Sequence, residues 1–151
     1  MKQTNQKVSV VRRTVCALLM VLLAASLTAC GGGGKKNSNA NALYFTNNLN
    51  SEVHNFYVSP TDTDAWGDPL TDGIIKKGRT ATIDFNKVVN GEGTYDIGAI
   101  DENYMNYDLY GVDIHLRDTI ILEGSAEGAT FTIEHDDGTT STYDAYIYKS
   151  E

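Results

Sequence analysis

The fold class is decided by the stretch ATFTIEHDDGTTSTYDAYIYK, residues 129–149. Apolar and polar residues alternate over residues 129–134, which is the period of a strand with one buried face. Asp136-Asp137-Gly138 follows and predicts a hairpin turn, because glycine accepts the positive φ that tight turns need. The tyrosine-rich segment 143–149 predicts the returning strand. This part of the chain therefore predicts a β-hairpin.

The same alternation recurs upstream of this hairpin. It is clearest over residues 80–85 and 94–100. Shorter strand candidates cover residues 43–46, 53–59, 104–109 and 119–122, and residues 47–50 read as a turn. No apolar stripe of helical period is longer than two turns. We therefore expect an all-β fold, an antiparallel β-sandwich of about eight short strands that forms a single domain over residues 43–151.

The N-terminal segment has the pattern of a secretory signal peptide. Its basic residues are Lys2, Lys7, Arg12 and Arg13. An apolar run over residues 15–27 follows, and at about 20 Å in helical form it is shorter than a bilayer core of about 30 Å. The run ends in Leu27-Thr28-Ala29-Cys30, which resembles the lipobox of bacterial lipoproteins. The resemblance implies a signal peptide over residues 1–29, and a lipid with palmitate-type acyl chains on Cys30.

Lipidation at Cys30 predicts where the protein resides. We expect it on the cell membrane or outer membrane, facing away from the cytoplasm and held there by its N-terminal lipid. Residues 30–42 are rich in Gly, Asn, Ser and Lys and predict a flexible tether. The other cysteine, Cys16, lies within the signal. The domain thus has no cysteine for a disulfide, a thiol nucleophile or a metal.

The charge balance argues against one class of partner. The whole chain has 12 basic and 20 acidic residues, and four basic but no acidic residues lie in the signal. Eight basic against twenty acidic residues then remain, a net charge of −12. So acidic a surface repels phosphate backbones, and we expect no nucleic-acid partner.

One long connection, residues 59–73, differs from the rest of the chain. It contains the only tryptophan, both prolines and four aspartates. Its pattern resembles a group of small secreted bacterial β-domains with no assigned activity. The matching positions are Asn47-Asn48, Tyr57-Val58-Ser59-Pro60, Trp66-Gly67, Leu70 and Gly78. This resemblance implies the β fold and supplies no catalytic residue.

Three aspartates of this connection suggest a cation site. Asp62, Asp64 and Asp68 take positions one, three and seven of a calcium-loop spacing, with Gly67 at position six. Position twelve is Gly73, where such loops carry a bidentate glutamate. Weak Ca²⁺ binding is one interpretation, and turn-capping aspartates are the other.

Trp66 also has two interpretations. An exposed indole can stack on a sugar ring and so act as a ligand platform. Alternatively, the indole folds back as a plug at the end of the sandwich, which we favour because a small domain needs buried aromatic area. The three histidines, His54, His115 and His135, show no ligand spacing such as i, i+2 or i, i+4. We therefore expect no zinc site from them.

The sequence carries no catalytic signature. It has no Gly-x-Ser-x-Gly elbow, phosphate-cradling glycine loop or His-Glu-x-x-His motif. We therefore predict a non-enzymatic, surface-displayed binding or structural module for an unidentified extracellular ligand or protein. The alternative is a carboxylate-dependent hydrolase that acts on extracellular glycans with some of the chain's scattered acidic residues.

Overall fold

The computed structural model describes residues 41–63, 65–88 and 94–150. The predicted signal peptide, Cys30 and nearly all of the predicted tether lie outside the described residues, as does Asp64. Within the described ranges, no helix is long and apolar enough to cross a bilayer.

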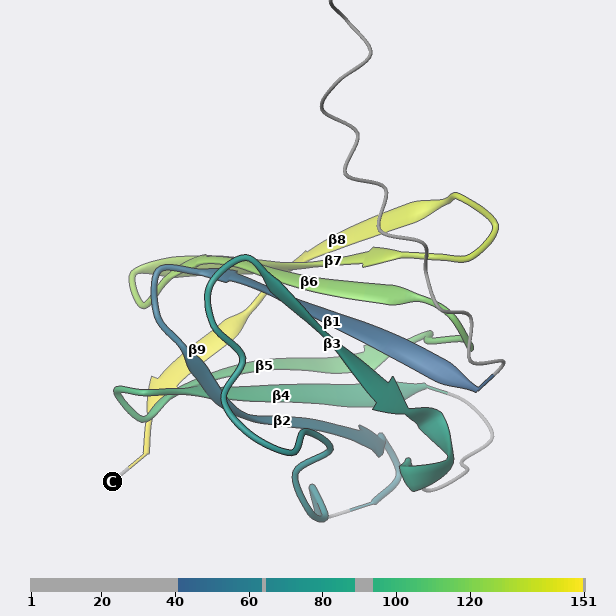
Figure 1. Cartoon of the computed structure of the whole chain (residues 1–151), viewed down its shortest axis with the longest axis horizontal. Coiled ribbons are helices and arrows are strands. Elements are labelled where there is room, and N and C mark those ends of the chain that lie inside the picture. The colour runs from purple at the N-terminus through teal and green to yellow at the C-terminus, as the bar shows by residue number, and fades with distance from the viewer. Residues whose placement is uncertain (1–40, 64, 89–93, 151) are drawn as a thin grey trace, which may run out of the picture. The chain divides into compact units, whose positions relative to one another are not determined.

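The described chain forms nine β-strands and one 3₁₀ turn. They are β1 (Ala42–Leu49), β2 (Val53–Pro60), β3 (Arg79–Asp84), η1 (Phe85–Lys87), β4 (Tyr95–Asp101), β5 (Met105–Val112), β6 (Thr119–Ser125), β7 (Gly128–Glu134), β8 (Thr140–Asp144) and β9 (Tyr146–Lys149). A five-stranded sheet has the order β3-β1-β6-β7-β8, and a four-stranded sheet has the order β2-β4-β5-β9. The two sheets lie one above the other in Figure 1. The prediction of a single-domain β-sandwich is confirmed.

Strand pairing is antiparallel with one exception. β1 pairs in parallel with β6, with Phe45 opposite Ile120. The predicted hairpin is the β7–β8 connection, in which Gly138 has a φ of 89° and its N–H donates to the carbonyl of His135 at 2.9 Å. The hairpin turn predicted at Asp136-Asp137-Gly138 is therefore confirmed, with Gly138 in the positive-φ conformation.

Two predicted segments have different boundaries in the structure. The single strand expected over residues 143–149 is wrong: it is split at Ala145, so that β8 belongs to one sheet and β9 to the other. The expected turn over residues 47–50 is also misplaced, because β1 continues to Leu49. Asn47 stays in the strand because its buried amide donates to the carbonyls of Ser51 and Ile75, at 2.9 and 2.8 Å.

The core lies between the two sheets. Phe45 of β1 stacks on Phe56 of β2, with ring centroids 4.0 Å apart, so the two layers meet through aromatic rings. Phe131, Ile97 and Tyr107 are also fully buried. Each such side chain contributes about 1.5–3 kcal/mol of transfer free energy to the stability of the described domain.

The connection after β2 returns along the edge of the four-stranded sheet. The N–H of Leu70 donates to the carbonyl of Phe56 at 2.8 Å, and Ile75 forms an antiparallel bridge with Val53. Leu70 and Ile75 are buried in the core. The loop between β2 and Leu70 is thus held at both ends along the edge strand β2.

Candidate ligand-binding site

The pinned loop places Trp66 on the outer face of the four-stranded sheet. Gly98 lies between the buried residues Ile97 and Ala99 of β4, so its own position faces outward. A Cβ added at Gly98 would lie 3.3 Å from Cη2 and 3.3 Å from Cζ3 of Trp66. The missing side chain at Gly98 is therefore what lets the indole dock on the sheet.

Two tyrosines flank the docked indole. Tyr57 of β2 lies directly across from Gly98 in the strand pairing, and its ring centroid is 6.2 Å from that of Trp66. Tyr110 of β5 approaches from the other side, also at 6.2 Å. Trp66 and Tyr57 are half-buried and Tyr110 is exposed. The three rings form an aromatic group open to solvent, which we call the Trp66 face.

A buried carboxylate holds the tyrosine side of this face. Asp108 of β5 is only 3% exposed, and it accepts hydrogen bonds from the hydroxyls of Tyr110 at 2.8 Å and Tyr148 at 3.0 Å. Burial raises the pKa of Asp108, although the two phenol hydrogen bonds act in the opposite direction. Burial and the hydrogen bond to Asp108 also raise the pKa of Tyr110. Asp108 thus fixes the Tyr110 ring beside Trp66.

A cavity of about 730 Å³ opens beside the Trp66 face. It is lined by the end of β2, by residues 65–70 and by Lys87. Trp66, Pro69 and Leu70 supply apolar walls, while Thr63 and Asp68 add polar groups. Concave, mainly apolar cavities of roughly 300–1,000 Å³ with a few polar groups are typical of small-ligand sites.

The residues expected in this loop have different outcomes. Trp66 lies over the middle of β4 and is half-buried, so a plug at the end of the sandwich does not describe its position. Asp62 and Asp68 are exposed on the loop, and Asp64 lies outside the described residues. Ca²⁺ binding by these aspartates stays a prediction.

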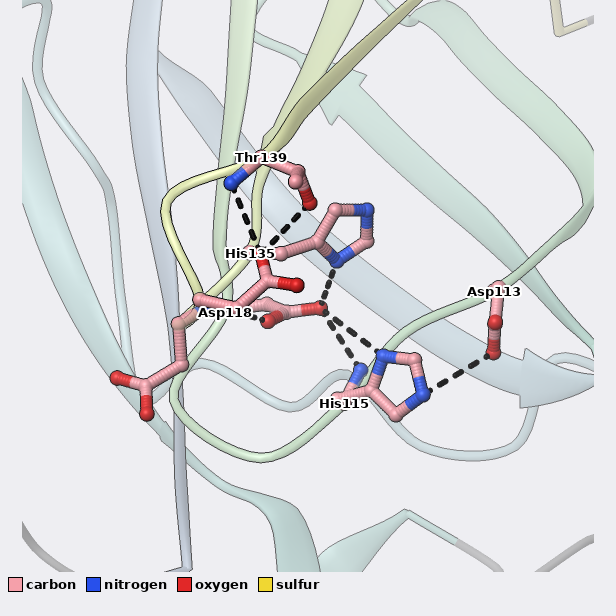
Figure 2. A network of polar contacts seen from close by, with 7 residues as sticks. Asp113, His115, Asp118, His135 and Thr139 are labelled. Atoms are coloured by element: carbon pink, nitrogen blue, oxygen red, sulfur yellow. Dashed lines mark hydrogen bonds and ion pairs between the residues drawn. The ribbon is translucent and has the colours of Figure 1, made fainter.

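The structure also brings together residues that lie apart in the sequence. His115, Asp118 and His135 place ligand-type atoms within 4.8 Å of one another. Figure 2 shows the two imidazole rings grouped around the Asp118 carboxylate. His54 is exposed on β2 and belongs to no such group among the described residues. Ligand spacing along the chain does not reveal this cluster, because its two segments are joined only by the pairing of β6 with β7.

A second buried carboxylate is structural. Asp101, at the end of β4, is 3% exposed and accepts hydrogen bonds from the N–H groups of Asn103 and Met105, at 2.8 and 2.9 Å. The hydroxyl of Ser51 donates to it at 2.8 Å. Burial alone would raise the pKa of Asp101, but these hydrogen bonds outweigh it and hold the pKa below the ordinary value of 3.8. Asp101 therefore closes the β4–β5 turn as an anion.

The chain matches no protein-family model, no curated protein and no solved structure. Its functional assignment therefore rests on the geometry of the Trp66 face and on the sequence.

Proposed function

We propose that this protein is a lipid-anchored, non-enzymatic binding module of the cell envelope, and that its Trp66 face binds neutral glycans. The observation that carries the proposal is an indole held in place by Gly98, flanked by Tyr57 and Tyr110, and open to a cavity of about 730 Å³. Aromatic rings fixed on a rigid sheet bind a ligand at little cost in side-chain entropy.

The chemistry of this face favours sugars over other ligands. A sugar ring presents apolar C–H groups that pack on aromatic rings, and hydroxyls that bond to polar side chains at the edge of the site. Thr63, Asp68 and Lys87 supply such groups around the cavity. The acidic net charge disfavours anionic polysaccharides, so the expected ligand is uncharged.

The lipid anchor belongs to the same proposal and is supported by the lipobox sequence that ends at Cys30. A Cys30→Ser variant expressed in a bacterial host should leave the membrane fraction and partition into the aqueous phase of a detergent extraction. Retention of the variant in the membrane at the wild-type level would argue against lipid anchoring.

Glycan binding is tested on an array of neutral oligosaccharides with the purified domain. Binding should be lost in Trp66→Ala and weakened in Tyr110→Ala. Tyr143→Ala is the matched control, because Tyr143 is an exposed tyrosine of β8 in the other sheet. Absence of binding by the wild type, or equal loss in the Tyr143→Ala variant, would contradict the proposal.

One observation favours a second candidate, a glycan hydrolase. The pKa of Asp108 is raised, as in a general acid, and the charge of nearby Asp96 contributes to that shift. We rank this second, because Asp108 is 3% exposed and already bonded to two tyrosines. Release of reducing ends from the bound oligosaccharides, abolished in Asp108→Asn, would favour the hydrolase.

A further inference from the structure

Two connections meet at one end of the five-stranded sheet. His115 and Asp118 belong to the segment between β5 and β6, and His135 begins the turn between β7 and β8. In the antiparallel pairing of β6 with β7, Thr119 lies opposite Glu134. Asp118 and His135 each adjoin one member of this pair, so the register of two central strands holds them together.

The two histidine side chains converge on one oxygen of Asp118. His135 Nδ1 lies 2.8 Å from Oδ2 of Asp118, and His115 Nδ1 lies 3.8 Å from the same atom. Figure 2 shows both rings directed at this carboxylate. Ligand atoms around a tetrahedral zinc ion stand about 3.3 Å apart, for bonds of about 2.0–2.1 Å. These two separations bracket this spacing, and all three ligand-type atoms lie within 4.8 Å of one another, so side-chain rotations could bring them to a common ion.

Asp118 is a buried carboxylate with few sources of positive charge. Its side chain is 0% exposed, and the backbone N–H groups of His115 and Asp136 donate to it at 2.8 and 3.1 Å. Arg117 instead pairs with Asp136 at 2.7 Å. Among the described residues the only cationic partners of Asp118 are the two histidines. A buried charge needs a counter-charge, which either a protonated histidine or a metal ion supplies.

The surroundings suit a bound cation. Asp113 Oδ1 lies 3.6 Å from Nε2 of His115, on the side of the ring away from Asp118. A carboxylate in that position orients a metal-binding histidine and leaves its other nitrogen free. A cavity of about 470 Å³ adjoins the cluster, and its lining includes Asp136, Asp137 and Thr139. It has room for a water or an external ligand at the metal.

We propose that His115, Asp118 and His135 form a binding site for a divalent transition-metal ion of the zinc class. Nδ1 of each histidine and Oδ2 of Asp118 are the ligands, and a fourth position faces the cavity. Nδ1 of His135 must be unprotonated to bind the ion. When the ion is bound, the imidazole proton of His135 is on Nε2. Any proton that Nδ1 carried beforehand is released to water.

The site is tested with Zn²⁺ alone, by competition against a chromophoric chelator, on the purified domain. Wild-type protein should bind one ion per chain. His115→Ala and His135→Ala should each weaken binding by about 100-fold or more, and Asp113→Asn by about 10–100-fold. Co²⁺ in place of Zn²⁺ should give the visible absorption of a four-coordinate site, lost in the same histidine variants.

His54→Ala is the matched control, because His54 is an exposed histidine outside the cluster. It should bind Zn²⁺ as the wild type does. Circular dichroism establishes that each variant is folded. No stoichiometric Zn²⁺ binding by the wild type, or equal loss in His54→Ala, would overturn the proposal. Neither result bears on glycan binding at the Trp66 face, which lies on the other sheet.

Discussion

Replacing Gly98 by valine tests how the Trp66 face is built. A Cβ at this position would lie 3.3 Å from two atoms of the indole and 3.3 Å from Oδ1 of Asp108. Valine extends a further bond of about 1.5 Å beyond Cβ, into the space that the indole occupies. No positive φ is imposed at Gly98, and valine favours strands. The expected costs are therefore the displacement of Trp66 and of the neighbouring Asp108 carboxylate.

The size of this effect follows from the aromatic packing around the indole. A displaced Trp66 no longer packs against Tyr57 and Tyr110, and each of these ring pairs is worth about 0.5–1.5 kcal/mol. We expect the free energy of unfolding to fall by about 1–3 kcal/mol, and the melting temperature by about 4–12 °C. The emission of Trp66 should also shift to longer wavelength, and the chain has no other tryptophan.

Gly128→Val is the matched control for this substitution. Gly128 is exposed at the start of β7, and a Cβ there would meet no atom within 4 Å. Thermal melts and Trp66 emission spectra of the two variants should therefore differ. If Gly98→Val melts and emits like Gly128→Val and the wild type, the indole does not dock at Gly98 and the reasoning fails.

Three further predictions concern the core, a buried carboxylate and the aspartate loop. Phe131→Ala should lower the free energy of unfolding by about 3–5 kcal/mol in urea titrations, because a fully buried ring is removed; a loss below about 1 kcal/mol would argue against the core described. The pKa of Asp101 is lower in the folded chain than in the unfolded chain. The ionised carboxylate therefore stabilises the folded state above about pH 4, and this contribution is lost as the pH falls through the folded pKa. Asp101→Asn should therefore lose most stability at neutral pH and converge on the wild type in acid, and a pH-independent difference would contradict this. If Asp62 and Asp68 help to bind Ca²⁺, millimolar Ca²⁺ should raise the melting temperature and change the Trp66 emission. Identical melting curves and emission spectra with Ca²⁺ and with a chelator would instead indicate that these aspartates only cap turns.

The sequence predicts what is local in this fold. Period-two alternation and Gly138 identify the strands and the hairpin, because both depend on neighbouring residues. The break at Ala145 is not predictable in this way, since a strand propensity does not say to which sheet a residue belongs. Asparagine is a common turn residue, and the sequence therefore predicts a turn at Asn47. In the structure its side chain instead donates to the backbone carbonyls of Ser51 and Ile75, and Ile75 is distant in the sequence.

In the candidate sites, too, the sequence predicts local features but not contacts between distant segments. Trp66 stands out in the sequence as the only tryptophan, in an unusual loop. The indole docks on Gly98 because this position of β4 has no side chain. The alternation of apolar and polar residues does not distinguish Gly98 from the other outward-facing residues of the strand. His115 and His135 are 20 positions apart in the sequence, and the β6–β7 register is what brings His135 to Asp118. The one local signal is the i, i+3 spacing of His115 and Asp118.

The central claim, that the Trp66 face binds neutral glycans, is tested most directly by a two-dimensional ¹H–¹⁵N NMR titration with a soluble neutral oligosaccharide selected on the array. Saturable shifts should be confined to the indole Nε1–H of Trp66 and to the backbone amides of Gly98, Tyr110 and the residues that line the adjoining cavity, among them Thr63, Asp68 and Lys87. The amide of His135, at the end of the other sheet, should not move. Shifts elsewhere, with the Trp66 indole unmoved at saturation, would contradict the account.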